Sequence, residues 1–283
     1  MEDHSHHVAT SESPDDMAEM LDLDGEVLHG YLSAVISWVK DLTVDVPPRR
    51  IVDLGSGTGT GTIALAQAFP AADVLAIDTS DNLLNRVMTK ASAIGVVDRI
   101  IPIHADLDTA WPVIDTVDIA WASMSLHHLA DPDSSLADIL AMLRPGGLLV
   151  TAEMDDLPRF LPDDLGIGRP GLEKRCHEAL AEAHARRLPS LGLDWGPRLS
   201  HAGFAAVTKR TFPIDPDLPL PPSTGRYAQT FLQHIRYQLD DVIAADDQIT
   251  LDALIEVGGP HSVLRRPDLV VRGTRTVWVG SRT

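Results

Sequence analysis

The chain has 283 residues and a formal net charge of −18, which allows one large hydrophobic core but excludes the cationic surface that nucleic-acid binding needs. It contains no run of about 18 apolar residues, so we expect no membrane partner. The single Cys176 excludes a disulfide framework and a multi-cysteine metal site within the chain. Acidic residues replace the basic start of a signal peptide, so we expect a cytoplasmic location.

The N-terminal segments come first in chain order. Residues 1–16 are polar and acidic, and we expect them to form a disordered tail. The tail contains three histidines, but a disordered segment offers a metal ion no fixed geometry, so no metal site is expected. Apolar residues between Leu28 and Val39 recur at helical spacing, which predicts an N-terminal helical cover over residues 17–46. The main domain is then expected at 47–283.

Short apolar segments next alternate with helical patterns. The five predicted strands of this part are Ile51–Leu54, Val74–Ile77, Ile100–Ile103, Val117–Ala122 and Leu148–Ala152. The predicted helices follow Gly61, run through Leu83–Met88, and span about Ser134–Leu143. Short apolar strands separated by helices are typical of a parallel sheet that is covered on both faces.

The second half is less regular. It adds a helix that begins near Pro170, with Cys176 on its apolar face, and two more strands at Phe204–Phe212 and Leu269–Val279. The predicted fold class is therefore α/β: a doubly wound, mainly parallel seven-stranded sheet with helices on both faces, N-terminal helices and a helical insertion before the last strand.

The insertion spans about residues 213–260. It contains two predicted helices, and Thr250 is the expected N-cap of the second. A segment of this length is too long for a passive turn between strands. Two interpretations remain: a lid over the ligand site, which we favour, or a contact surface in a homo-oligomer.

A glycine-rich loop follows the first predicted strand. Gly55, Gly57 and Gly59 occupy alternate positions, and a helical pattern begins directly after them. Glycine adopts positive φ without penalty, and it lets another molecule lie against main-chain atoms. A strand, a glycine loop and a helix N-terminus in this order indicate a site for a nucleotide-like small molecule.

Three acidic residues follow successive strands. Asp53 ends the first predicted strand, Asp78 follows the second, and Asp106 lies just beyond the third. Ligands of open parallel sheets bind outside the carboxyl ends of the strands. An acid at the end of the second strand is placed to accept hydrogen bonds from ribose hydroxyls.

The glycine spacing discriminates between two cofactor classes. A dinucleotide site requires G-x-G-x-x-G directly after the strand, but the frame from Gly55 has Thr60 at its last position. A second frame, which starts at Gly59, begins too far beyond the strand. An NAD-dependent dehydrogenase is therefore the less favoured interpretation.

The motifs resemble those of class I (Rossmann-like) S-adenosylmethionine-dependent methyltransferases, in the same order along residues 50–152. The similar segments are Asp53-x-Gly-x-Gly-x-Gly59, Ala76-Ile-Asp78, Ala105-Asp106-Leu107, Asp118–Leu129 and Leu143–Leu149. The resemblance implies S-adenosyl-L-methionine as cofactor. It also implies a cofactor site made of Asp53, Gly55, Ser56, Gly57, Gly59, Asp78, Thr79, Ala105, Asp106, Leu107, Ser123 and His128.

His127 and His128 are the candidate catalytic residues. They follow the fourth predicted strand, at the edge where cofactor and acceptor would meet. Histidine is the commonest general base, and a base is needed when the acceptor must lose a proton. The alternative is that one imidazole packs against the following helix and the other only lines the cofactor.

The leading hypothesis is transfer of a methyl group to a small-molecule acceptor by in-line displacement. Such a reaction depends mainly on orientation, which supplies about 7–11 kcal/mol in favourable cases. The alternative is a regulatory protein that binds S-adenosylmethionine without catalysis. The sequence leaves open the identity of the acceptor, the atom that receives the methyl group and the oligomeric state.

Overall fold

The computed structural model describes residues 14–187 and 190–283. The first helix, α1 (Pro14–Val27), begins at Pro14, so residues 14–16 are helical rather than part of the expected tail. The remainder of that tail lies outside the described residues. Within the described ranges, no helix is long and apolar enough to cross a membrane.

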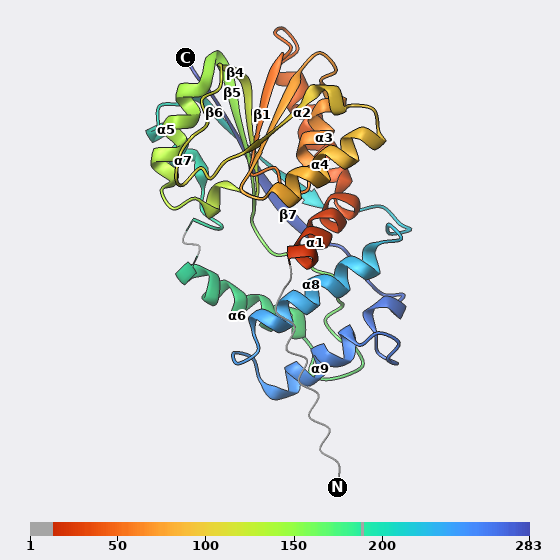
Figure 1. The fold of residues 1–283 in the computed structure, drawn as a ribbon. Helices are drawn as coiled ribbons and strands as arrows, with labels where there is room; N and C mark the ends of the chain where they lie inside the picture. The colour runs from red at the N-terminus through yellow and green to blue at the C-terminus, as the bar shows by residue number, and fades with distance from the viewer. Residues whose placement is uncertain (1–13, 188–189) are drawn as a thin grey trace.

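A seven-stranded sheet forms the centre of the molecule (Figure 1). Its strands are β1 (Arg50–Leu54), β2 (Asp73–Asp78), β3 (Ile100–His104), β4 (Val117–Ser123), β5 (Leu143–Met154), β6 (Ala205–Ile214) and β7 (Gly273–Ser281). The order across the sheet is β3-β2-β1-β4-β5-β7-β6, and β7 is antiparallel to both of its neighbours. The mainly parallel seven-stranded sheet predicted from the sequence is confirmed.

Helices cover both faces of the sheet because successive strand residues point to opposite sides. On β1, Ile51 packs with α2 (His29–Leu42), α3 (Thr60–Ala68) and α4 (Asp81–Ala93) on one face. Its neighbour Val52 packs on the other face with α5 (Pro132–Met142) and α7 (Trp195–His201). Figure 1 shows these two helical layers on either side of the strands.

Helix α7 was not predicted from the sequence. It is seven residues long, too short for a clear apolar period, and Asp194 caps it by accepting a hydrogen bond from the Gly196 backbone N–H at 3.0 Å. Trp195 and Leu199 are fully buried against the sheet. The short 3-10 helices are Val97–Arg99, Leu126–His128 and Val263–Arg265.

A second group of helices lies beyond the carboxyl ends of the parallel strands (Figure 1). This cap consists of α1, α6 (Leu172–Arg187), α8 (Thr224–Gln238) and α9 (Ala245–Ile255). It has its own hydrophobic core, in which Phe160, Tyr227 and Leu251 are buried. The expected N-terminal cover is thus divided: α1 belongs to the cap, whereas α2 packs on the sheet.

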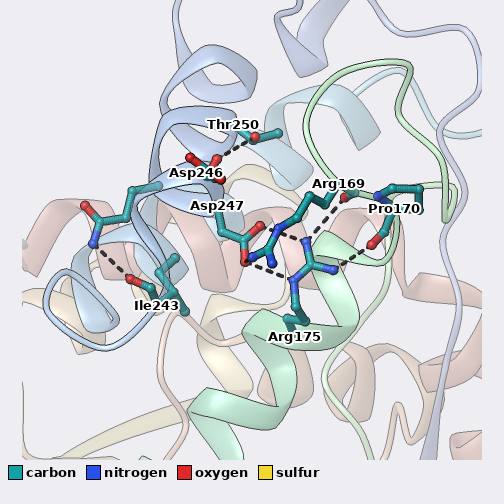
Figure 2. A network of polar contacts seen from close by, with 8 residues as sticks. Arg169, Pro170, Arg175, Ile243, Asp246, Asp247 and Thr250 are labelled. Carbon is teal, nitrogen blue, oxygen red and sulfur yellow. Dashed lines mark hydrogen bonds and ion pairs between the residues drawn. The ribbon is translucent and has the colours of Figure 1, made fainter.

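Ionic contacts join α9 to the start of α6 (Figure 2). Asp247 is 3% exposed and accepts hydrogen bonds from Arg175 Nε at 2.9 Å and from Arg169 at 2.8 Å. The expectation that Thr250 caps this helix is wrong. The helix begins at Ala245, and Thr250 lies inside it with its hydroxyl donating to the Asp246 carbonyl.

Candidate functional site

The glycine loop has the conformation that its composition predicted. Gly55, Gly57 and Gly59 have φ values of 71°, 53° and 87°. The backbone N–H groups of Gly55 and Ser56 both donate to the Ile77 carbonyl at 2.9 Å, which fixes the loop against β2. The loop therefore presents main chain, rather than side chains, at the carboxyl edge of the sheet.

Among the three loop glycines, Gly57 has the fewest atoms around the point that a Cβ atom would occupy. Only Leu21 Cδ1, 3.3 Å away, lies within 4 Å of the point that a Cβ atom would occupy. At Gly55 and Gly59, by contrast, a Cβ atom would lie 2.7 Å from Ser125 and 2.8 Å from Val87. Ser125 and Val87 therefore leave no room for a Cβ atom at Gly55 and Gly59, and at Gly57 the side chain of Leu21 from α1 packs closely on the loop.

Asp53 lies near the end of β1, just before the glycine loop, and contacts the helix that follows it. Its side chain is only 2% exposed, and Oδ2 accepts a hydrogen bond from the Thr62 hydroxyl at 2.6 Å. Burial raises the pKa of the Asp53 carboxyl to about 7, against the opposing effect of that hydrogen bond. The carboxyl thus holds the first turn of α3 in place, and direct contact with a cofactor stays a prediction.

Asp78 joins the end of β2 to the loop. Its Oδ2 accepts from the Gly57 backbone N–H at 2.8 Å, and its Oδ1 accepts from the Ser80 N–H at 3.0 Å. The side chain is half-buried, while the adjacent Thr79 is exposed. The acid predicted to hold the ribose is therefore hydrogen-bonded directly to the glycine loop.

Asp106 lies at the next strand end. Its carboxylate is exposed and accepts from the Asp108 backbone N–H at 3.0 Å and from the Thr109 hydroxyl at 2.9 Å. The Ala105 N–H donates to the Asp78 carbonyl, which joins the ends of β3 and β2. Leu107 is half-buried beside them. The structure thus brings the loop, Asp78 and the Ala105–Leu107 segment to one edge.

His127 forms a buried pair with a residue that the sequence did not single out. Its Nδ1 lies 2.5 Å from Glu153 Oε2, and the two side chains are 5% and 2% exposed. Glu153 lies near the end of β5, and its Oε1 has no hydrogen-bond partner among the described residues. A lone acid in the apolar run Leu148–Met154 was the available signal, because buried carboxylates require a partner.

His128 is in a different environment. It is exposed, and its ring centroid lies 4.1 Å from that of His127. Desolvation by the surrounding protein and, second, the proximity of His127 lower the pKa of His128 to about 4. Ser123, which is half-buried, precedes this turn at the end of β4. The two adjacent histidines are therefore not equivalent.

A polar cluster beneath the cap was also missed. Tyr227 donates a hydrogen bond from its hydroxyl to Asp24 at 2.6 Å, and Arg275 lies 3.9 Å from the same carboxylate. Tyr31 is in this cluster: burial raises its pKa to about 12, while Arg275 and Ser123 oppose the shift. These residues come from α8, α1, β7 and α2, so no sequence motif could join them.

Helix α1 contacts the glycine loop directly. Lys90 donates to the Thr58 carbonyl at 2.9 Å and is also bonded to Asp22 of α1. In addition, a Cβ atom on Gly25 would lie 2.5 Å from the Thr60 hydroxyl, so this helix is closely packed on the loop. The cap therefore reaches the glycine loop at this edge of the sheet, while Thr79 and Asp106 remain exposed beside it.

The arrangement suits a nucleoside-bearing cofactor. Gly57 offers main chain, Asp78 offers a carboxylate, and the segment around Asp106 offers polar groups at the neighbouring strand end. In the described part of the chain, no three His, Cys, Asp or Glu side chains are grouped as a metal site would require.

Comparison with known proteins supports this interpretation. A family model described as a methyltransferase domain matches residues 51–147. A malonyl-[acyl-carrier protein] O-methyltransferase of Gallionella capsiferriformans is 27% identical over 169 residues, which cover 57% of this chain and 53% of that protein. A demethylmenaquinone methyltransferase of Thermus thermophilus is 32% identical over 121 residues, which cover 42% of this chain and 53% of that protein. The chain thus spans about half the length of these curated relatives.

A solved structure shares the fold. The phosphoethanolamine N-methyltransferase 2 of Haemonchus contortus, in complex with phosphomonomethylethanolamine and S-adenosylhomocysteine, is 15% identical, with a TM-score of 0.51. The similarity covers 88% of this chain and 52% of that chain.

Proposed function

We propose that this chain, whose residues 51–147 match a methyltransferase domain, is a class I S-adenosylmethionine-dependent methyltransferase that transfers the methyl group to a small-molecule acceptor. One observation carries the proposal: the glycine loop and Asp78 meet at the carboxyl edge of the sheet, with Gly57 donating its N–H to Asp78 at 2.8 Å. The methyltransferase relatives support the same reaction class.

Each part of the edge has a separate task in this proposal. The cofactor supplies a methyl group on a sulfonium, which needs no further activation. The loop around Gly57 and the Asp78 carboxylate hold the nucleoside end, as in the family that the motifs resemble. The segment Ala105–Leu107 bounds the adenine side. What remains for the protein is to orient the acceptor in line with the methyl group.

We assign the proton-accepting role to His127 rather than His128. The Glu153 carboxylate at Nδ1 fixes the orientation of the imidazole and leaves Nε2 to accept a proton. His128, with a pKa of about 4, is the weaker base. Glu153 acts through His127, so it is a positioning residue.

The helical cap beside this edge favours a small acceptor over a macromolecule. The cap helices α1 and α8 are joined by the bidentate contact of Arg226 with Glu19, at 2.8 and 3.0 Å. Covered sites of this kind enclose most of a small ligand's surface, whereas a macromolecular substrate needs an open approach. The insertion at 213–260 contributes α8 and α9 to the cap, which favours the interpretation of this segment as a lid over the one as an oligomer contact.

Two measurements test the proposal. Isothermal titration calorimetry should show saturable binding of S-adenosylmethionine, and tight NAD binding without it would overturn the assignment. Incubation with a broad acceptor library should release S-adenosylhomocysteine. If cofactor binds but no acceptor yields that product, the chain is a non-catalytic S-adenosylmethionine-binding protein instead.

A further inference from the structure

A pocket of about 460 Å³ lies outside the site described above. It is bounded by the segment after β5, the start of α6 and the first residues of β7. Three cationic side chains line it: Arg159, Lys174 and Arg272. Such a group is notable in a chain with a net charge of −18.

Backbone pairing holds two of these cations side by side. The Arg159 N–H donates to the Arg272 carbonyl at 2.8 Å, and the Arg272 N–H donates back to the Arg159 carbonyl at 3.0 Å. This is an isolated antiparallel bridge. Residues that exchange both bonds have Cα atoms about 5.5 Å apart, with side chains on the same face. The bridge therefore places both guanidinium groups at one pocket wall.

Neither guanidinium forms a hydrogen bond or an ion pair within residues 14–187 and 190–283. Burial raises the pKa of the Glu173 carboxyl to about 7 and so outweighs the electrostatic effect of Arg159 on this group. Like charges directly opposite one another in a strand pair are destabilising. Their most favourable neighbour is an anion that accepts hydrogen bonds from both, because planar guanidinium groups bind oxyanions in a bidentate manner.

The carboxyl groups of the pocket do not fill this role. Glu173 is 7% exposed and accepts from the backbone N–H groups of Phe160 and Leu161, at 2.7 and 3.3 Å. Asp156 and Asp163 also line the pocket, but both are exposed and neither is bonded to the two arginines. The arginine pair is thus left open to a ligand.

We propose that this pocket binds a phosphate-type oxyanion between Arg159 and Arg272, with Lys174 as a third cationic contact. The oxyanion has two possible sources: free phosphate, or a phosphate ester carried by the methyl acceptor. The second source is geometrically reasonable, because Arg275 Nη1 donates to the Asp156 and Thr274 carbonyls, both on the pocket wall, at 3.3 Å. The same guanidinium lies 3.9 Å from Asp24, so Arg275 links the pocket wall to the polar cluster under the cap.

Phosphate binding to the full chain, without cofactor, tests the site itself. Isothermal titration with inorganic phosphate at low ionic strength should give one saturable site. The double variant Arg159→Ala/Arg272→Ala should weaken it at least about tenfold, as expected for two lost charge-assisted contacts. The matched control Lys40→Ala/Arg49→Ala also removes two exposed cations, far from the pocket, and should bind phosphate as the parent does.

Both double variants lose two positive charges, so a difference in their phosphate affinity must come from the position of the arginines in the pocket. Circular dichroism should show that both remain folded, and the milder Arg159→Gln/Arg272→Gln should reproduce the loss. Absence of saturable phosphate binding to the parent, or equal binding by all variants, overturns the proposal whether or not the chain transfers methyl groups.

A second arm identifies the source of the oxyanion. Acceptor candidates are assayed as matched pairs, with and without a phosphate ester. If the acceptor carries the oxyanion, the double variant raises KM for the phosphorylated member alone, with unchanged S-adenosylmethionine affinity. If free phosphate is the ligand, phosphate binding is lost in the variant while KM is unchanged for both members of each pair.

Discussion

His127 Nδ1 lies 2.5 Å from Glu153 Oε2, which joins the turn after β4 to the end of β5 in a buried pair. The contact engages Nδ1, so Nε2 is the nitrogen that remains for an acceptor proton. Because Glu153 Oε1 has no partner among the residues described, the carboxylate depends on this imidazole for its compensation.

His127→Ala should lower turnover by about 100-fold or more, because general-base catalysis contributes on that scale. Affinity for S-adenosylmethionine should change little. Steady-state kinetics and calorimetry on the same preparation measure the two quantities. Glu153→Gln should lower turnover less and should alter the pH profile, since it replaces a carboxyl group beside the imidazole with a neutral amide and keeps the side-chain length.

His128→Ala is the matched control for this prediction, because it removes the adjacent exposed imidazole and leaves the buried pair intact. Its turnover should stay within a few-fold of the parent. The assignment fails if His128→Ala loses turnover while His127→Ala retains it.

Asp78→Ala should weaken S-adenosylmethionine binding by about 1–3 kcal/mol, through the loss of ribose hydrogen bonds and of the contact with Gly57. Calorimetric titration measures the change. Asp81→Ala removes an exposed acid nearby, which pairs with His104, and should leave the affinity unchanged. Unaltered binding by Asp78→Ala would show that the ribose is held elsewhere.

Gly59→Ala and Gly95→Ala form a matched pair. Both glycines have positive φ, but a Cβ atom would lie 2.8 Å from Val87 at Gly59 and would meet nothing within 4 Å at Gly95. Gly95→Ala should therefore cost only the backbone penalty of about 1–2 kcal/mol in unfolding free energy. Gly59→Ala should cost about 1–3 kcal/mol more through overpacking. Equal losses in urea unfolding would contradict the packing role of Gly59.

The buried Asp53 carboxyl should make the unfolding free energy depend on pH. Its pKa of about 7 in the folded protein, raised chiefly by burial, exceeds the unfolded value. Between about pH 4 and pH 7 the folded state keeps a proton that the unfolded chain releases, so this contribution to stability falls as pH rises. Above pH 7 it is constant.

Asp53→Asn should remove this decrease in stability with rising pH, because an amide does not titrate. The amide oxygen can still accept a hydrogen bond from the Thr62 hydroxyl. Relative to the variant, the parent should lose on the order of a few kcal/mol of unfolding free energy between pH 4 and pH 7. Urea unfolding at a series of pH values measures this. A constant difference across the range would show that Asp53 is already ionised at low pH.

Asp247→Ala should lower the unfolding free energy by about 1–3 kcal/mol, because it removes the charged hydrogen bonds with Arg169 and Arg175. The hydrogen bond from Arg175, the largest effect, lowers the pKa of Asp247, so this stabilisation is present above about pH 4 and is lost as pH falls further. Asp246→Ala removes an exposed neighbouring acid and should change stability by less than about 0.5 kcal/mol. Equal losses would contradict the anchoring role of Asp247.

Local patterns account for what could be predicted of the fold. The strand at Ile51–Leu54 and the helix that follows the glycine loop were predicted within a residue or two of their observed bounds, because each has a strong period of its own. The start of helix α9 was predicted too late in the chain, because the sequence around Thr250 resembles a helix N-cap. Its true position depends on Asp247, which is held by two arginines more than 70 residues away.

The sequence by itself determined the parallel sheet, the glycine loop and the order of acids behind it, since backbone conformation and strand ends are local properties. Only the tertiary structure decided that Asp53 is buried, that Glu153 is the partner of His127, and that α1 lies with α8 in a cap. The physical reason is the sequence separation of the residues involved. Burial and charge compensation depend on which side chains meet after folding, and the residues that meet here come from strands and helices far apart in the chain.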